Sequence, residues 1–412
     1  MTADNGARLA AILPTGLAAL ASGLGADASE TLSAALGPRG GGAAAAPSGL
    51  PAVRSLVLLV VDGLGHANLR AARGHARTLS GLPTRRIETV IPSTTGAALT
   101  TLTTGRLPGE HGLIGYRIRH PERGLVTTLK DWQGIEDRAA WQRSSPLFAA
   151  AADLGARPVA IGRPAHAVGG LTEAILAGAE YLGGQTIPER FAIASRLLRG
   201  DAPILAYLYI DELDRAAHRD GWRSDAWLRR LEELDAALEG FLRTLPGGVG
   251  VVVTADHGMV DVPPQRRIRL DAGVDALAGV EQIGGEPRMR SLYLRAGEDA
   301  RAVAERVAAS LGKTARVGTR DEAIAANWFG PVDPSVAPRL GEVLVTARGE
   351  NAFTLGTDSP EALAMVGQHG GLSDDERGVP LALGGALEGT GFAAAVTETA
   401  ARVSPAAAPA AT

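Results

Sequence analysis

Three apolar runs along the chain lead into acidic residues. Ser55–Val61, Ile204–Ile210 and Val249–Thr254 are short and rich in Val, Leu and Ile. Such runs are typical of strands that are buried on both faces of a parallel sheet. The residues that follow them include three carboxylates, Asp62, Asp214 and Asp256. Because ligands bind beyond the carboxyl ends of such strands, the pattern indicates that the three acids meet at one edge of the sheet.

Helical periodicity predicts further elements along the chain. Apolar residues recur at helical spacing over 224–245, and a second amphipathic helix is expected over 299–311. A strand-like segment, SLYLRA, precedes this second helix, and more strand-like sequence follows it. We therefore predict an α/β fold, with a mainly parallel sheet covered by helices on both faces and a small α+β subdomain inserted at about 285–345.

Composition divides the chain into three parts. Residues 1–50 are expected to form a surface helix and a flexible linker, because 37–50 is rich in Gly, Ala and Pro. Residues 51–384 are expected to form the α/β domain with its insertion. Residues 385–412, which end in SPAAAPAAT, are expected to be disordered.

Charge and composition exclude several classes of function. The formal net charge of −4 and the pI of about 6.1 give no basis for nucleic-acid binding or a polybasic membrane contact. The absence of cysteine excludes disulfides, thiolate metal sites and cysteine nucleophiles. No apolar run approaches the ~20 residues of a membrane span. A cytoplasmic location is the default expectation, with an export signal as the alternative, because Asp4 precedes Arg8 and Pro14 interrupts the first apolar stretch.

Histidines lie close to two of the acids in the sequence. Asp214 and His218 have the i, i+4 spacing that places both on one helix face, so that both can reach one ion. His257 follows Asp256, and a glycine after it permits a turn that aims both side chains inward. His369 lies between glycines in GQHGG. With Asp62, the set provides three carboxylates and three imidazoles, which suit Zn²⁺ or Mn²⁺ better than Ca²⁺.

A threonine-rich segment provides the candidate nucleophile. In PSTTGAALTTLTTG, which begins at Pro92, Ser93–Thr95 are natural N-cap residues for a helix over 97–102. A hydroxyl at a helix N-terminus suits phosphoryl chemistry, because free N–H groups and the helix dipole favour a bound anion. Alone, such a stretch is usually a capped helix, as a lone Asp after a strand is usually a turn residue. The functional hypothesis therefore rests on the combination.

The segments VVDGLG, PSTTGAALTTLTTG, DELDRAAH, TADHG and GQHGG, in this order, resemble the alkaline phosphatase superfamily. The resemblance is to its type I phosphodiesterase and nucleotide pyrophosphatase branch, over about residues 54–384. It implies hydrolysis of a phosphodiester or nucleotide pyrophosphate bond by two in-line displacements through a phosphothreonine. Thr95 rather than Thr94 is the implied nucleophile, because it lies three residues after Pro92 and ten before Gly105.

The resemblance also implies two divalent metal ions, with zinc expected and manganese as the alternative. The first ion is assigned to Asp62, Thr95, Asp256 and His257. The second ion is assigned to Asp214, His218 and His369.

One position departs from the family pattern. Many phosphodiesterases of this type carry Asn three residues after the nucleophile as a donor to a phosphoryl oxygen, and this chain has Ala98 there. Loss of one such donor costs about 10²–10³ in rate. The candidate replacements, and thus the candidate substrate-binding groups, are the Gly96 backbone N–H, Tyr116, Arg117 and Lys130.

Two alternative functions stay open. The first is a phosphomonoesterase or phosphonate hydrolase that uses the same site. The second is a non-catalytic metal-binding relative that acts as a binding module. The expected partner is a small-molecule phosphate ester, with nucleotides among the candidates, and the sequence leaves the substrate and the oligomeric state open.

Overall fold

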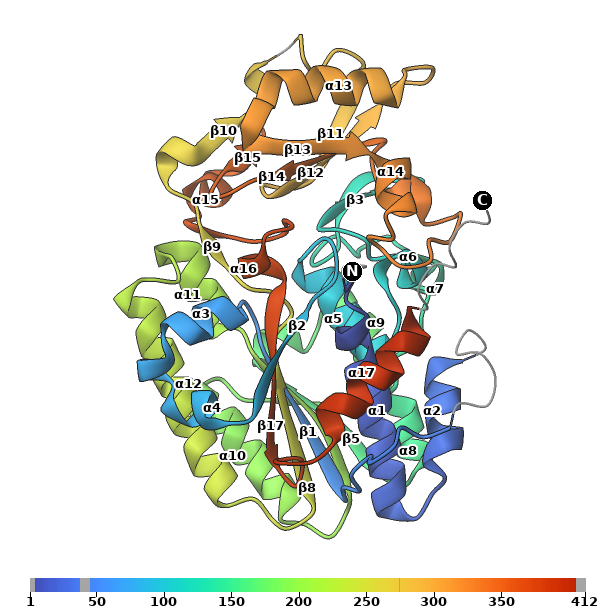
Figure 1. Ribbon diagram of the computed structural model, residues 1–412, viewed down its shortest axis with the longest axis vertical. Helices are drawn as coiled ribbons and strands as arrows, with labels where there is room; N and C mark the ends of the chain where they lie inside the picture. The colour runs from blue at the N-terminus through green and yellow to red at the C-terminus, as the bar shows by residue number, and fades with distance from the viewer. Residues whose placement is uncertain (1–3, 38–44, 274, 405–412) are drawn as a thin grey trace.

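The computed structural model describes residues 4–37, 45–273 and 275–404, and a seven-stranded sheet lies at its centre (Figure 1). Across the sheet the order is β2 (Thr84–Glu88), β17 (Gly378–Gly385), β8 (Val249–Thr254), β1 (Ser55–Val61), β7 (Ile204–Ile210), β5 (Arg157–Gly162) and β6 (Glu180–Gly183). The five strands from β8 to β6 are parallel to one another, whereas β17 and β2 each pair antiparallel. The predicted α/β fold with a mainly parallel sheet is confirmed.

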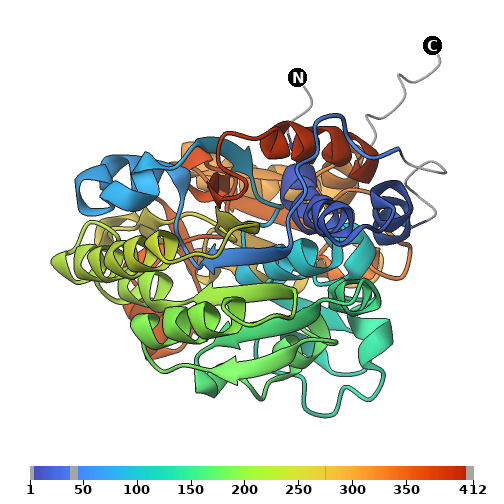
Figure 2. The same cartoon turned by 90° about the horizontal axis from the view of Figure 1, so that it is seen from below.

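Helices cover both faces of this sheet (Figures 1 and 2). One face carries α1 (Ala7–Leu24), α5 (Thr95–Thr104) and α17 (Phe392–Val403), with α2 (Ala28–Leu36) packed on α1. The other face carries α10 (Ile187–Leu198) and α12 (Asp225–Arg243), with α11 (Glu212–Asp220) and α4 (Arg77–Gly81) packed on α12. The helix predicted over 224–245 corresponds to α12, and its N-cap Ser224 accepts a hydrogen bond from the Trp227 N–H.

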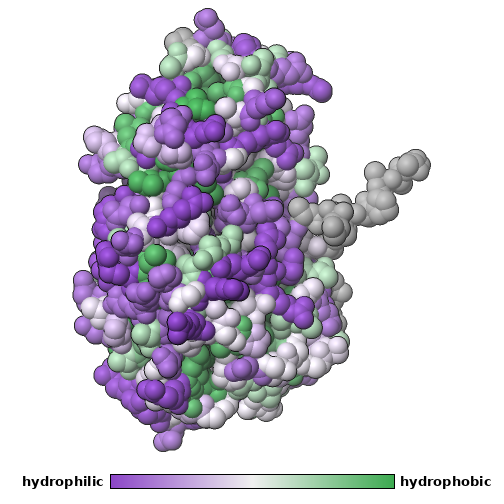
Figure 3. Space-filling model, turned by 60° about the vertical axis from the view of Figure 1, so that its left-hand side comes forward, coloured by the Kyte–Doolittle hydropathy of each residue, from purple (hydrophilic) through white to green (hydrophobic). Residues whose placement is uncertain are grey.

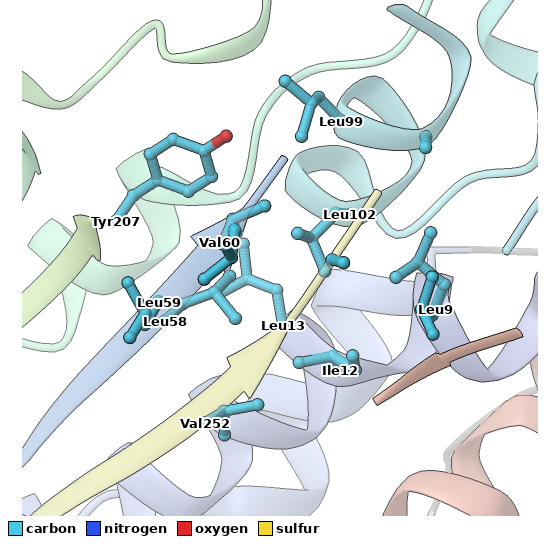
Figure 4. Packing of buried hydrophobic residues seen from close by; sticks show 14 of the residues in the cluster. Leu9, Ile12, Leu13, Leu58, Leu59, Val60, Leu99, Leu102, Tyr207 and Val252 are labelled. Carbon is cyan, nitrogen blue, oxygen red and sulfur yellow. The ribbon is translucent and has the colours of Figure 1, made fainter. Parts of the chain in front are cut away.

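The N-terminal helix α1 is a core element, so the prediction of a surface helix is wrong. Every residue from 9 to 21 is buried, because α1 is apolar on all sides and packs between α5 and α17. Figure 4 shows Leu9, Ile12 and Leu13 of α1 facing side chains of β1 and α5. By length and composition α1 is the one described helix that could cross a membrane, and 78% of its apolar window is buried inside the protein.

The C-terminal segment differs from the prediction of disorder. Residues 392–403 form α17, and Phe392 and Val396 are fully buried against the main core. The Thr15 hydroxyl of α1 lies 3.0 Å from the Thr399 hydroxyl of α17, both buried. The small alanine side chains of α17 allow this helix to pack closely on α1. Residues 405–412 and the linker residues 38–44 lie outside the described residues.

A second sheet lies at one end of the molecule, at the top of Figure 1. It is antiparallel, in the order β11 (Val280–Glu286), β12 (Met289–Leu294), β14 (Val343–Ala347) and β13 (Ala315–Thr319), and α13 (Ala300–Leu311) packs on it. A separate hydrophobic cluster holds this unit together. The two segments that connect it to the main domain contain β10 (Arg267–Arg269) and β15 (Ala352–Thr354). These two strands pair with each other. We call this α+β unit the insert.

Short elements connect the two sheets. A hairpin of β3 (Arg117–His120) and β4 (Gly124–Thr127) contacts β11, and β9 (Val260–Asp261) pairs with β16 (Gly367–Gln368). Short helices occupy the remaining connections: α3 (His66–Ala71), α6 (Pro108–His111), α7 (Arg138–Trp141), α8 (Phe148–Asp153), α9 (Gly170–Ile175), α14 (Arg320–Ala325), α15 (Pro360–Ala364) and α16 (Asp374–Arg377). Hydrophilic residues cover most of the face in Figure 3.

Candidate metal centre and nucleophile

The sequence-predicted ligand residues converge at the carboxyl ends of three adjacent strands. Asp62 follows β1, and Asp256 and His257 follow β8. On α11, directly after β7, lie Asp214 and His218. A fourth segment joins from outside the sheet, because His369 follows β16 on the loop that leads to α16.

The three carboxylates each leave one buried oxygen without a hydrogen-bond partner among the described residues: Asp62 Oδ1, Asp214 Oδ1 and Asp256 Oδ2. Their other oxygens are held in part by the protein. The Tyr209 hydroxyl donates to Asp62 Oδ2, and Asp256 Oδ1 accepts from the N–H groups of Gly63 at 3.1 Å and His257 at 2.9 Å. Buried polar atoms in folded proteins almost always have partners. Three such oxygens in one place therefore indicate a site for cations.

The three histidines share one hydrogen-bonding arrangement. In each, Nδ1 lies against a backbone carbonyl: His257 against Gly258 at 3.1 Å, His218 against Gly367 at 2.8 Å and His369 against Ser93 at 3.0 Å. A carbonyl only accepts, so Nδ1 carries the proton in the neutral ring and Nε2 keeps its lone pair. Metal-ligating histidines typically have their other ring nitrogen fixed in this way.

Burial controls the protonation of the cluster. Desolvation, followed by the charge of His218, lowers the pKa of His257 to about 3, and desolvation lowers the pKa of His369 well below its usual value. Burial, followed by Asp256 and Asp214, raises the pKa of Asp62 well above its usual value, and burial raises that of Asp214 to about 6. The rings of His257 and His369 thus stay neutral and able to ligate, while the carboxylates lack a compensating positive charge.

Two groups of ligand atoms are close enough to hold one ion each. Asp62, Asp256 and His257 form the first group, and Asp214, His257 and His369 form the second, with the atoms of each group within 4.8 Å of one another. The rings of His257 and His369 stack at 3.6 Å and 11°. His218 adjoins the second group, because its Nε2 lies 3.3 Å from Asp214 Oδ1 and its ring 5.2 Å from that of His369. Mixed imidazole and carboxylate donors fit zinc or manganese.

Thr95 lies at the edge of the first group. It is the first residue of α5, and its hydroxyl is 3.1 Å from His257 Nε2. Thr94 precedes the helix in extended conformation and is buried, without a side-chain cap hydrogen bond to the first turn. The structure therefore places the Thr95 hydroxyl beside the ligand cluster, with the N-terminal amides of α5 next to it.

The four residues predicted to bind substrate have different surroundings. Gly96 follows Thr95, and a Cβ there would lie 2.7 Å from the Thr128 hydroxyl oxygen. Tyr116 and Arg117 are partly buried where β3 begins, and burial raises the pKa of Tyr116. Lys130 is exposed, and no hydrogen bond or ion pair joins it to the cluster within the described ranges.

Ala98 is fully buried in the main hydrophobic core. A polar side chain at this position would be placed in that core.

Sequence reasoning missed three groups that the fold brings to the cluster. Tyr209 donates to Asp62, Ser93 accepts from His369 through its carbonyl, and the buried carboxyl of Glu286 lies beside the Thr94 hydroxyl. Tyr209 lies within the predicted strand, where alternation would have placed it on one face with Tyr207. No sequence signal marks Glu286, because its neighbour Thr94 lies in a distant part of the sequence.

The fold and this site define an α/β protein of the alkaline phosphatase type. The sequence profile of the type I phosphodiesterase / nucleotide pyrophosphatase family matches residues 56–372. The chain belongs to this family, whose members hydrolyse phosphate esters, and the family resemblance is confirmed.

Solved structures show the same fold. Murine ectonucleotide pyrophosphatase/phosphodiesterase 5 is 18% identical, with a TM-score of 0.64, and the match covers 80% of this chain and 88% of that chain. Phosphonoacetate hydrolase from Sinorhizobium meliloti 1021, in complex with phosphonoformate, is 21% identical, with a TM-score of 0.61 and coverage of 85% and 97%. No curated protein sequence matches the chain.

Proposed function

We propose that this protein hydrolyses a phosphodiester or nucleotide pyrophosphate bond with Thr95 as its nucleophile. The observation that carries the proposal is the position of the Thr95 hydroxyl, 3.1 Å from His257 Nε2 and at the first turn of α5. Two divalent metal ions, zinc or manganese, are part of the proposal. The ligands are Asp62, Thr95, Asp256 and His257 for one ion, and Asp214, His218 and His369 for the other.

The chain's own groups suggest the order of events. The Thr95 hydroxyl gives up its proton and its oxygen attacks phosphorus, the bond to the leaving alcohol or phosphate breaks with protonation of that group, and a phosphothreonine forms. Water then loses a proton as it attacks the phosphothreonine, which returns a proton to the Thr95 oxygen and releases the phosphate product. The α5 amides and helix dipole stabilise negative charge on the phosphoryl oxygens. When bound, divalent ions lower the pKa of a nearby hydroxyl or water and stabilise the attacking and leaving oxygens.

Gly96, Tyr116, Arg117 and Lys130 are the proposed contacts to the rest of the substrate. A nucleotide substrate is supported by the solved complex of an inactive variant of the murine relative with AMP. The alternative is a phosphonate hydrolase or phosphomonoesterase, and the similarity to phosphonoacetate hydrolase supports it. Both use the same ligand cluster and differ in the ester that they cleave.

The test compares hydrolysis of bis-p-nitrophenyl phosphate, p-nitrophenyl phosphate and the p-nitrophenyl ester of thymidine monophosphate. We expect faster release from the two diesters, loss with chelator and recovery with Zn²⁺ or Mn²⁺. A preference for the monoester would replace the diesterase proposal with a phosphatase. Thr95→Ala should remove nearly all turnover and keep the metal, with Thr103→Ala as the matched control, because the Thr103 hydroxyl donates to the Leu99 carbonyl within α5. Turnover that survives Thr95→Ala would exclude Thr95 as the nucleophile.

A separate measurement tests the second ion and the binding-module alternative. His369→Ala should lower the metal-to-protein ratio from two toward one, because it removes one Nε2 from the group with Asp214. An unchanged ratio would remove His369 from the site. Two bound ions in a protein that cleaves neither diesters, monoesters nor phosphonates would favour the binding module.

A further inference from the structure

The turn between β11 and β12 of the insert reaches the candidate centre. This turn, residues 286–289 (the insert turn), carries two buried ionisable side chains. Arg288 is fully buried, and Glu286 is 5% exposed. Burial of charged groups is costly unless they are paired and hydrogen-bonded. Their contacts therefore show what the insert turn does.

Arg288 joins the insert to the main domain. Its Nε and Nη2 donate to the two oxygens of Glu376 at 2.9 and 2.7 Å, and both side chains are fully buried. Its Nη1 donates to the carbonyls of Gly349 at 2.7 Å and of Asn351, which lie on the loop before β15. The Arg288 guanidinium thus bonds both to the loop before β15 and to α16 of the main domain. A bidentate pair of this kind fixes geometry as well as charge.

Glu376 also bonds to the loop that carries His369. Its Oε1 accepts from the Gly371 N–H at 2.8 Å, and its Oε2 accepts from the Ser373 hydroxyl at 2.5 Å. The Ser93 hydroxyl donates to the Gly371 carbonyl at 2.9 Å and accepts from the Gly370 N–H at 3.2 Å. These bonds hold both residues after His369.

Ser93 completes the connection, because its own carbonyl accepts from His369 Nδ1 at 3.0 Å. The orientation of the His369 ring therefore depends on a continuous set of hydrogen bonds that begins at Arg288.

Glu286 makes a second connection between the same two loops. Its carboxyl lies beside the hydroxyl of Thr94, the residue before Thr95, and its Oε1 has no hydrogen-bond partner among the described residues. On its other side it lies against Gly370, where an added Cβ would come within 2.4 Å of the Glu286 carboxyl carbon. The Glu286 side chain thus fills the space between the start of α5 and the loop after His369.

We propose that the insert turn positions His369 and Thr95, with Arg288 as the main positioning residue and Glu286 as a second contact. The proposal rests on the proposed function, in which these two residues are a metal ligand and the nucleophile. Among the proposed ligands, His369 follows a two-residue strand of a separate pair instead of the central sheet. Its ring therefore needs outside support, and the insert turn supplies it.

The test separates positioning from simple stability. Removal of one member of a buried ion pair leaves an uncompensated charge, whereas replacement of both by apolar residues of similar volume is often neutral or stabilising. The double variant Arg288→Met/Glu376→Met should therefore fold. We expect it to bind one of its two metal ions about 10–100-fold more weakly, as for other residues that orient metal ligands.

The readout is metal content by mass spectrometry across a series of free Zn²⁺ concentrations, together with kcat and KM on a diester. At a concentration that saturates the wild type, the double variant should hold about one ion per chain, with kcat reduced more than KM. If the double variant does not fold, Arg288→Lys provides the same measurement, because lysine keeps the charge and lacks the bidentate fork. It should weaken the same ion.

The matched control is the double variant Arg290→Met/Asp358→Leu, which likewise replaces both members of a largely buried ion pair. Arg290 lies two residues from Arg288 and also pairs with an acid, Asp358, at 2.6 Å, and it donates to the Phe353 carbonyl at 2.9 Å. These partners lie outside the loop that carries His369, so this variant should keep two ions. Wild-type affinity for both ions in the Arg288 variants would overturn the inference and leave the proposed function intact. A wild type that binds no metal and cleaves no phosphate ester would refute the proposed function itself.

Discussion

Metal removal should make the stability of this protein depend on the ionisation of Asp214. Without a cation, burial raises the pKa of Asp214 from 3.8 to about 6; Asp256 and Asp211 act in the same direction, while His218 opposes them. Between these two pKa values the folded protein keeps a proton that the unfolded chain releases. The contribution of Asp214 to the free energy of unfolding is therefore fully present below about pH 4 and is lost as the pH rises through 6.

The size of this loss follows from the shift. A difference of 6 − 3.8 = 2.2 in pKa, at 1.36 kcal/mol for each unit, corresponds to about 3 kcal/mol. Asn has nearly the shape of a protonated Asp and does not ionise. Metal-free Asp214→Asn should therefore gain about 3 kcal/mol relative to metal-free wild type between pH 4 and pH 7.5. With saturating Zn²⁺ the order should reverse, because the ion stabilises the native state that binds it.

Urea unfolding of chelator-treated protein, followed by tryptophan fluorescence, measures this difference. The low pKa values of His257 and His369 make the free energy of unfolding rise with pH, which is the opposite dependence. Wild type and Asp214→Asn share this contribution, so it cancels in the comparison. Asp220→Asn, on the exposed end of α11, is the control and should show no pH-dependent gain. A gap between wild type and Asp214→Asn that is equal at pH 4 and pH 7.5 would refute the reasoning.

Three further predictions concern other parts of the structure. Tyr209→Phe removes the hydroxyl that donates to Asp62, so metal affinity in a chelator competition should fall about 10–100-fold, and unchanged affinity would contradict this role. Phe392→Ala should cost about 3–5 kcal/mol in urea unfolding, because the ring is fully buried; a cost below about 1 kcal/mol would show that α17 is not part of the core. Gly96→Ala should slow diester hydrolysis about 100-fold by displacing Thr95, because the added Cβ would lie 2.7 Å from the Thr128 hydroxyl. Thr128→Ala in the same protein should restore part of the rate, and no restoration would argue against the steric cause.

The central strands were predictable because nearly all of their residues are buried. β1, β7 and β8 have the bounds expected from the three apolar runs, since strands buried on both faces need no polar residue until they end. The position of Asp62 at the site follows from the same reasoning. Helix α1 was not predictable in this way, because it is buried by α17, which comes from the opposite end of the chain. No local pattern shows that an Ala-rich tail will cover an N-terminal helix.

The orientation of the ligands depends on contacts that the sequence does not display. The Tyr209 hydroxyl and Asp62 are 147 positions apart, and His369 and Ser93 are 276 positions apart. The partner of His369 is, moreover, a backbone carbonyl, which every residue type provides. A motif can therefore identify the ligand, whereas only the fold identifies the group that orients it.

This distinction explains why the insert matters to a site built at the edge of another sheet. His257 lies shortly after the end of β8, and the carbonyl that accepts from its ring belongs to the next residue of the same segment, Gly258. His369 has no such support, and the Ser93 carbonyl that orients it belongs to a different loop. Ser93 bonds these two loops to each other, and a third element that bonds to the His369 loop restricts it further. In this protein the third element is the insert turn, so changes in the insert should alter the binding of one ion before they alter the other.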